Sequence, residues 1–361
     1  MLQAVNSSSA DLCHINLARG FRGGERQTEL LVRELSAYVP LQRLVVRAGA
    51  PLAARLADVE GITIVSVSGR VAAAKASRGA ALIHAHETGA AQAALLTSCL
   101  SAIPYIITRR VDNRPRAAAV TRLMYRRAAC TVVISTAIEK VLRQVEPRID
   151  CRLIPSASSN LAGDAAWATT YRTRFPGKFV VGHVGAFDFG HKGQDTLLAA
   201  ARMLERSRPD VHFVLVGAGR DEAQLRALAA DRSNVTIEGW ADNVGDYLAA
   251  FDLFAFPSVH EGLGSILLDA MQFGLPIVAS AVGGIPDLIA PDENGLLVPP
   301  RDAAALAAAI SRLSLDTDLR DTMAAANRRM AGDYQPAAMA RSYLDIYTEF
   351  LPRLRAGLVA R

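Results

Sequence analysis

Two carboxylates eight positions apart, Glu261 and Asp269, flank a glycine pair and the start of a helical pattern. A helix that begins at these glycines would present free backbone N–H groups and its positive dipole end, which together bind phosphate. Glycine lets a phosphate approach the backbone with no side chain in the way. Repulsion from that phosphate would leave Glu261 free for a neutral, hydroxyl-rich group. The pattern therefore predicts a site for a diphosphate beside a polyol, as in a nucleotide sugar.

The same stretch resembles the signature of the family 4 retaining glycosyltransferases, in which seven residues separate two glutamates. Near the start of the chain, Gly23-Gly24-Glu25-Arg26 resembles the glycine-rich loop of that family's first domain. Three shorter matches follow at His84-Ala85-His86, Lys192-Gly193 and Gly217-Ala218-Gly219. The resemblance implies an α/β protein with the GT-B fold, in which two doubly wound, Rossmann-like domains face a central cleft.

The resemblance also implies three catalytic residues. Glu261 would orient the donor sugar, and Lys192 would neutralise the departing diphosphate. His86, at the end of a predicted strand, would reach the sugar near its reacting centre, whereas His84 has the pattern of a core histidine. From position alone, Lys192 also fits a solvated loop lysine, and Glu261 also fits a carboxylate stabilised by the helix dipole.

The donor-binding set implied by the resemblance surrounds these residues. Asp269 stands where the family has a second glutamate for the ribose hydroxyls, and its side chain is one methylene shorter. Ala186 stands where the family usually has an arginine, and Arg220 and Arg19 are candidates to supply the missing cation. The other expected donor-binding positions, apart from Lys192 itself, are Gly23, Gly24, Gly185, Gly217, Trp240, Gly262, Leu263, Gly264 and Ser265, and Glu238 is a weaker candidate near the base.

Neither a metal nor a bound cofactor is expected. Gly217-Ala218-Gly219 lacks the third glycine of a dinucleotide fingerprint, because position 222 is Glu222. We find no cluster of histidine, cysteine and acidic residues with metal-ligand spacing in the sequence. The expected co-substrate is a UDP- or GDP-sugar. Cationic side chains and a helix N-terminus would neutralise its diphosphate, which a metal ion does in other enzymes.

Composition limits the class of protein. With 361 residues, 51% hydrophobic and 21% charged, the chain suits two well-cored domains rather than a disordered protein. The four cysteines indicate buried side chains in a reducing compartment. Residues 88–108 are uncharged, but their polar residues and a proline favour helix, turn and strand over a membrane span. With no signal-peptide pattern, we expect a cytoplasmic protein, and peripheral contact with the inner face of the membrane stays open.

Short apolar runs alternate with helical patterns in both halves of the chain, which predicts parallel sheets with right-handed crossovers. The expected strands are 12–17, 44–46, 62–67, 82–84, 105–108 and 131–134, then 180–184, 212–216, 236–238, 253–256 and 277–279. A stretch rich in serine and alanine, 156–167, is interpreted as the linker. We expect an acceptor-binding domain at 1–157, completed by a crossover helix at 339–361, and a nucleotide-sugar-binding domain at 158–338.

One segment of the first half is strongly basic. Between residues 109 and 127 a single acid, Asp112, accompanies seven arginines: Arg109, Arg110, Arg114, Arg116, Arg122, Arg126 and Arg127. The segment carries +6, more than the +5 of the whole chain. We predict contact of Arg109, Arg110, Arg122, Arg126 and Arg127 with an anionic glycolipid or lipopolysaccharide acceptor at the membrane surface. A solvated basic helix is the alternative, and nucleic acid is not expected because aromatic stacking platforms are lacking.

Three functions therefore stay open. The first is a retaining, metal-independent glycosyltransferase that builds a lipopolysaccharide, glycolipid or polysaccharide of the cell envelope. The second is a nucleotide-sugar epimerase of the same fold. The third is a non-catalytic nucleotide-sugar-binding protein, which the departures at Ala186 and Asp269 make conceivable. The glycine-rich run and the spacing of its two carboxylates favour the transferase.

Overall fold

The computed structural model describes residues 12–115, 118–351 and 354. Arg116 of the basic segment lies outside these residues. The chain forms two compact units: residues 1–157 with 336–361 make the first unit, and residues 158–335 make the second. Each unit is described by itself below.

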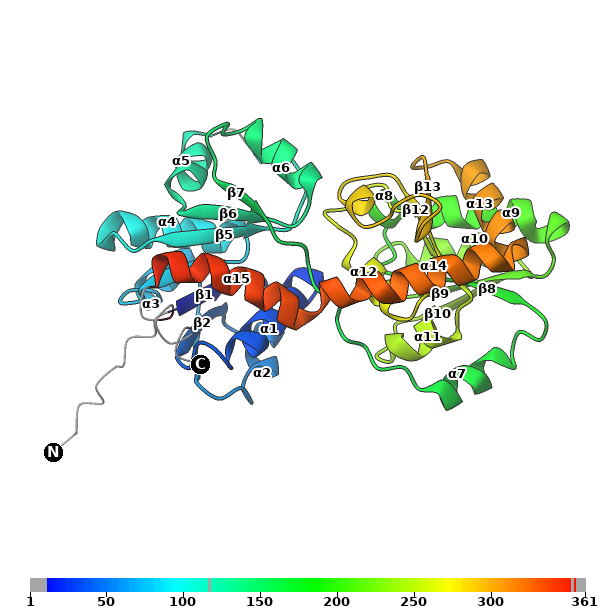
Figure 1. The fold of residues 1–361 in the computed structure, drawn as a ribbon, viewed down its shortest axis with the longest axis horizontal. Coiled ribbons are helices and arrows are strands. Elements are labelled where there is room, and N and C mark those ends of the chain that lie inside the picture. The colour runs from blue at the N-terminus through cyan, green and yellow to red at the C-terminus, as the bar shows by residue number, and fades with distance from the viewer. Residues whose placement is uncertain (1–11, 116–117, 352–353, 355–361) are drawn as a thin grey trace. The chain divides into compact units, whose positions relative to one another are not determined.

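The first unit contains a parallel sheet of seven strands in the order β3-β2-β1-β4-β5-β6-β7 (Figure 1). The strands are β1 (Leu12–Asn16), β2 (Gln42–Arg47), β3 (Ile62–Val67), β4 (Leu82–Ala85), β5 (Tyr105–Arg109), β6 (Cys130–Val133) and β7 (Cys151–Leu153). Every residue of β1, β4, β5 and β6 is buried. Strands buried on both faces are typical of a parallel sheet covered by helices, which explains why these runs are mostly apolar rather than alternating.

The helices of the first unit are α1 (Gly23–Leu35), α2 (Pro51–Arg55), α3 (Arg70–Ala76), α4 (Thr88–Ser101), α5 (Ala119–Arg127), α6 (Thr136–Arg143) and α15 (Pro336–Phe350). Helix α15 comes from the far end of the sequence and lies beside α1 (Figure 1). Its residues Tyr343 and Tyr347 join a buried cluster with Leu12, Leu31 and Ile106. The last helix is thus part of the core of the first unit.

The second unit contains a parallel sheet of six strands in the order β10-β9-β8-β11-β12-β13. The strands are β8 (Phe179–Val184), β9 (Val211–Val216), β10 (Val235–Gly239), β11 (Leu253–Phe256), β12 (Ile277–Ser280) and β13 (Gly295–Val298). The sequence patterns predict all of these except β13. Strand β13 has only four residues and follows a polar turn, so its pattern is too short to separate from a loop.

The helices of the second unit are α7 (Ala165–Arg172), α8 (Phe189–Lys192), α9 (Gln194–Ser207), α10 (Glu222–Ala229), α11 (Val244–Ala250), α12 (Ser265–Gln272), α13 (Ala303–Leu315) and α14 (Thr317–Met330), with 3₁₀ turns η1 (Ile285–Asp287) and η2 (Ala331–Tyr334). Apolar residues of α9 and α13 pack on the sheet in one cluster, including Leu197, Leu306, Val181 and Phe213. Helix α7 begins inside the stretch expected to be a linker.

Both sheets have a topological switch point. The strand order reverses between β1 and β4 in the first unit and between β8 and β11 in the second. In doubly wound sheets, ligands bind at the carboxyl ends of the strands beside such a reversal. The loops after these four strands are therefore the first place to look for a site.

The uncharged stretch 88–108 forms helix α4, a turn and strand β5, as the sequence predicts. Helix α4 is fourteen residues long, too short to span a bilayer. Within the described part of the chain, the helices are all too short or too polar to cross a membrane.

Four histidines are buried in strands, and three of them are considered first: His14 in β1, His183 in β8 and His212 in β9. Burial lowers the pKa of each from 6.5 to about 4, because desolvation disfavours the imidazolium form. These rings stay neutral in the folded chain at pH values where a histidine of the unfolded chain is protonated.

Acidification from pH 7 to pH 5 should therefore destabilise the folded chain. Between the unfolded pKa near 6.5 and the folded pKa near 4, unfolding takes up protons, so stability is full above this window and declines as the pH falls through it. The slope is up to about 1.4 kcal/mol per pH unit for each histidine. The urea midpoint should fall accordingly, less steeply in His212→Asn, whereas His191→Asn at an exposed position is the control. An unchanged midpoint from pH 7 to pH 5 would contradict this account.

Candidate active site

The switch point of the second unit brings together two predicted catalytic residues. Lys192 ends α8, which follows β8, and Glu261 lies in the loop after β11. Strands β8 and β11 are parallel neighbours, so their following loops emerge at the same edge of the sheet. The Lys192 Nζ atom lies 2.5 Å from Glu261 Oε2, and the two side chains are 21% and 16% exposed.

Two further contacts fix this ion pair. The Lys192 ammonium lies 5.0 Å from the centre of the Phe256 ring, a cation–π distance. The Ser258 hydroxyl donates to Glu261 Oε2 over 3.4 Å. The pair combines a cation for phosphate with a carboxylate for hydroxyl groups. An entering phosphate would have to compete with Glu261 for the lysine.

The loop that carries Glu261 leads directly into α12. Gly264 is the N-cap of this helix with φ +87°, a left-handed conformation that suits glycine, and no side chain caps the helix. A Cβ atom on Gly283 would lie 1.7 Å from the Glu261 carbonyl oxygen, so this second glycine lets its loop pack on the first. Gly262 and Ser265 flank the same helix start, and the Leu263 side chain is buried. The structure thus places the expected glycine run at a helix N-terminus.

A second glycine-dependent contact shapes the loop after β8. Gly217 follows β9 with φ +146°, and a Cβ atom there would lie 1.9 Å from the Gly185 carbonyl oxygen. The Phe187 N–H donates to the Ala218 carbonyl over 3.0 Å. The loops after β8 and β9 are therefore in close backbone contact. Gly185 and Gly217 both lie at the sheet edge that carries Lys192.

Position 186, where the family usually has an arginine, is occupied by the uncharged Ala186. Arg220, a candidate for the missing cation, lies in the adjacent loop after β9. The Arg220 guanidinium is 70% exposed and donates to Asp188 over 2.8 Å. The structure therefore puts a second cation at the same sheet edge of the second unit as Lys192. Arg19, the other candidate, is an exposed residue of the first unit after β1.

Three donor-site candidates have different environments. Trp240 follows β10, is 74% exposed, and donates from Nε1 to Asp242 over 3.2 Å. Asp269 is only 3% exposed and accepts a hydrogen bond from the Ser159 N–H over 2.5 Å. Glu238 accepts from Tyr171 and Arg174, which indicates a structural role. The structure thus leaves Trp240 open to a ligand and buries the Asp269 carboxylate inside the unit, where a role toward ribose stays a prediction.

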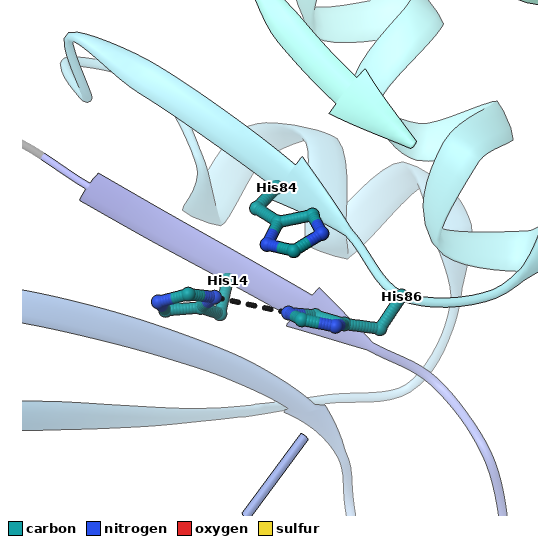
Figure 2. A group of neighbouring side chains, drawn as sticks. All are labelled: His14, His84 and His86. Atoms are coloured by element: carbon teal, nitrogen blue, oxygen red, sulfur yellow. Dashed lines mark hydrogen bonds between the residues drawn. The ribbon is translucent and has the colours of Figure 1, made fainter. Parts of the chain in front are cut away.

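In the first unit, His86 belongs to a buried group with His14 and His84 (Figure 2). The Gln42 amide donates to Val32 O, so its oxygen faces His14 Nε2, which then carries the proton. His14 Nδ1 must accept, 2.9 Å away, from His86 Nε2. His86 Nδ1 is left as an acceptor, 3.5 Å from the Arg110 guanidinium. The network fixes the tautomer of His86 and keeps its ring 3% exposed.

The three rings offer one nitrogen each within 4.8 Å of one another, so a metal site must be considered. His84 bonds to Tyr347 OH at 2.6 Å and to Thr108 Oγ1 at 2.7 Å, which uses both of its nitrogens. Burial, together with the charge of Arg110, holds the pKa of His84 and His86 well below the usual range. Because Arg110 would repel a cation, the arrangement fits a neutral hydrogen-bonded group better than a metal site.

The expectation that the sequence lacks metal-ligand spacing is wrong for one pair of aspartates, since Asp316 and Asp318 have the spacing of metal-binding Asp-x-Asp motifs. Asp316 is the N-cap of α14 and accepts from the Leu319 N–H over 3.0 Å. This pair therefore starts a helix that follows another helix, α13, rather than a strand of the sheet.

The basic segment divides between interior and surface. Arg109 is 6% exposed and bonds to Tyr125 and Asn113, whereas Arg122, Arg126 and Arg127 are exposed on α5. The prediction that Arg109 lies on an exposed basic face is wrong, because Arg109 is the last residue of a fully buried strand.

Arg110 lies between His86 and the start of α1, and its Cδ atom would be 3.8 Å from a Cβ atom on Gly24. Gly23 and Gly24 form the first turn of that helix.

Sequence reasoning missed several polar residues that shape these loops. Gln194 is fully buried at the start of α9 and bonds to the backbone of Ala186 and Asp188. In the first unit, Glu87 caps α4 by accepting from Gly89 and Ala90, and it also accepts from the Leu17 N–H. A polar residue directly before a helical pattern signals such a cap, but the signal is weak for glutamate.

Residues 178–316 match the family model described as "Glycosyl transferases group 1". The lipopolysaccharide core biosynthesis glycosyltransferase LpsE of Rhizobium meliloti is 30% identical over 234 residues, 63% of this chain and 66% of that protein. A GDP-mannose-dependent monoacylated alpha-(1-6)-phosphatidylinositol monomannoside mannosyltransferase of Corynebacterium glutamicum is 37% identical over 147 residues, 38% of each chain. The chain thus spans less than two thirds of the length of these relatives.

Among solved structures, Anabaena HepE in complex with UDP aligns with a TM-score of 0.80 and 19% identity, over 94% of this chain and 100% of that one. This similarity extends over both units and confirms the expected fold class: two parallel α/β domains of the GT-B type. Together, the family model and the relatives support a glycosyltransferase.

Proposed function

We propose that this chain is a retaining glycosyltransferase of family 4, which moves a sugar from a nucleoside diphosphate to an anionic glycoconjugate of the cell envelope. The second unit would bind the nucleotide sugar and the first unit the acceptor, at the cytoplasmic face of the membrane. The observation that carries the proposal is the Lys192–Glu261 pair beside the uncapped start of α12. A cation, free backbone N–H groups and a carboxylate at one switch point suit a diphosphate joined to a sugar.

Each group has a separate role in the proposed reaction. The ammonium of Lys192 and the first turn of α12 would stabilise the charge that develops on the departing diphosphate. Glu261 would accept hydrogen bonds from the sugar hydroxyls. The bond from the anomeric carbon to the phosphate oxygen breaks, the bond to the acceptor oxygen forms on the same face, and the departing phosphate takes the acceptor proton. This front-face route is what the resemblance to the family 4 signature implies.

The exposed indole of Trp240 is suited to stacking on the nucleobase. UDP is present in the HepE complex, and the mannosyltransferase named above depends on GDP-mannose. We therefore propose UDP- and GDP-sugars as the first donors to test. Conversion of the donor alone into an epimer would favour an epimerase, and transfer to an acceptor would exclude both the epimerase and the binding protein.

Lys192→Ala should reduce turnover by about a hundredfold or more, because the charge that stabilises the leaving group is lost. Glu261→Gln should retain nucleoside diphosphate binding but weaken the preference for the intact nucleotide sugar, because the carboxylate contact to hydroxyl groups is lost. Lys178→Ala is the matched control, since Lys178 bonds to Pro209 O before β8, at the opposite end of that strand. The measurements are steady-state turnover and calorimetric titration with UDP, GDP and their sugars. Normal turnover in both site variants would refute the assignment.

Activity should survive an excess of EDTA, because Lys192 and the α12 N-terminus would take the place of a divalent cation at the diphosphate. The measurement is initial rate with and without chelator, followed by addition of Mg²⁺ or Mn²⁺. A rate that falls with chelator and recovers with either ion would overturn the proposed site chemistry.

The acceptor proposal rests on the outer surface of the first unit. Arg122, Arg126 and Arg127 are exposed on α5, together with Val120, which is 59% exposed. Helix α4 contacts α5 and exposes Leu100 by 62% near its end. Arginines mixed with exposed apolar side chains are typical of surfaces that bind anionic membranes. The lipopolysaccharide and phosphatidylinositol relatives support an anionic lipid-linked acceptor.

The protein should sediment with vesicles that contain phosphatidylglycerol but not with pure phosphatidylcholine vesicles. Binding should weaken as salt rises from 50 to 500 mM, values chosen to shorten the Debye length well below its length of about 10 Å at 0.1 M. Arg122/Arg126/Arg127→Ala should lose most of this binding. Arg202/Arg206/Arg329→Ala, exposed residues of the second unit with the same charge change, should not. Equal losses in both variants would mean that net charge alone accounts for binding.

A further inference from the structure

The amide of Gln194, at the start of α9, connects strand β8 with both ends of the segment 186–188. Its Nε2 atom donates to the Ala186 carbonyl over 2.9 Å and to His183 Nε2 over 3.1 Å. Its Oε1 atom accepts from the Asp188 N–H over 3.3 Å. Both hydrogens and the oxygen of the amide are therefore used, and both ends of the segment 186–188 are attached to one side chain.

The orientation of this amide is dictated by His183. His183 Nδ1 lies 3.0 Å from the carbonyl oxygen of Ala255 in β11, and only a protonated Nδ1 can make that contact. The neutral ring then has a bare Nε2 atom, which requires a donor opposite it. The Gln194 nitrogen must face His183, and so its oxygen must face Asp188. His183 and Gln194 are both fully buried, which makes an unmet partner costly.

This network lies directly beneath the loop that carries Lys192. Gly193, between Lys192 and Gln194, has φ +67°, and a Cβ atom there would lie 2.1 Å from the Pro257 carbonyl oxygen. The His183 Nε2 atom would be 3.6 Å, and Lys192 Cδ 3.9 Å, from a Cβ atom on Gly185. The segment 185–192 is thus held by three sets of contacts: the hydrogen bonds of Gln194, the close packing of Gly193 on Pro257, and the ion pair of Lys192 with Glu261.

We propose that Gln194 and His183 are positioning residues: they hold the segment 185–192 in the shape that presents Lys192 to the diphosphate of the nucleotide. The contacts to Ala186, Asp188 and Ala255 link the β8 and β11 strands to this loop. The nature of the ligand rests on the proposed function, whereas the effect on the loop does not. Neither residue touches the ligand in this proposal, so both act through Lys192.

Gln194→Met tests the proposal, because methionine has similar length and volume but no amide. The matched control is Asn234→Leu, since Asn234 is also buried and its amide donates to Ala201 O of the same helix, α9. Both variants lose a buried amide in contact with one helix, and both should lose thermal stability. Only Gln194→Met should alter the loop at Lys192.

Three measurements separate a positioning role from a structural one. In Gln194→Met, amide hydrogen exchange in 185–193 should accelerate by about tenfold or more. The Kd for UDP or GDP should rise by about tenfold or more, since small misplacements of a binding group are costly. The imidazole ¹⁵N shift of His183 Nε2 should move toward that of an unbonded acceptor. In Asn234→Leu, the exchange rate in 185–193 and the Kd for UDP or GDP should stay within about twofold of the values for the starting protein. The ¹⁵N shift of His183 Nε2 should not change.

Unchanged exchange and unchanged Kd in folded Gln194→Met would overturn the proposal. Should that variant not fold, Gln194→Glu replaces it: the oxygen for the Asp188 N–H is kept, while the donors to Ala186 and His183 are lost, and the same two losses are expected. If the starting protein binds no nucleoside diphosphate, the proposed function fails, and hydrogen exchange in 185–193 alone then decides whether the network positions the loop.

Discussion

The parallel pairing of β8 with β11 is the contact on which the candidate site depends. Neighbouring parallel strands end at the same edge, so two loops that are 69 residues apart meet there and place Lys192 against Glu261. The helices that follow each strand begin at the same edge, and their first turns provide N–H groups for an anion. Strand pairing therefore sets the position of the cation, the carboxylate and the helix start together.

Each unit also contains neutral histidines beneath a loop at its switch point. In the first unit, Gln42 and His14 fix the tautomer of His86, and in the second, His183 fixes the amide of Gln194. In both cases a glutamine amide and a buried imidazole make directional hydrogen bonds that apolar packing cannot supply. Such networks specify one loop conformation as long as all partners are satisfied. The cost is that the rings must stay unprotonated.

The sequence predicts the strands and the glycine-dependent helix start well, because each depends on local residue patterns. Eleven of the thirteen strands in the described residues overlap expected runs, and the two that no run predicts, β7 and β13, have only three and four residues. The meeting of Lys192 with Glu261 follows from the order of parallel strands. The side-chain environments do not follow in this way. Burial of Asp269 and Arg109, and the contacts of Gln194, depend on long-range packing that no local pattern records.

The ion pair between Lys192 and Glu261 brings one positive and one negative charge together, so the pair itself is electrically neutral. A neutral pair has a weak long-range field, so free inorganic phosphate and other small anions in the surroundings would be attracted only weakly. A nucleotide sugar, as proposed, could engage the carboxylate with hydroxyl groups and the ammonium with phosphate at the same time. In the proposed reaction, the nucleoside diphosphate that is left after transfer has no sugar for Glu261, and the carboxylate would bind the lysine again. Competition between the two partners of Lys192 would then favour release of the product over its retention.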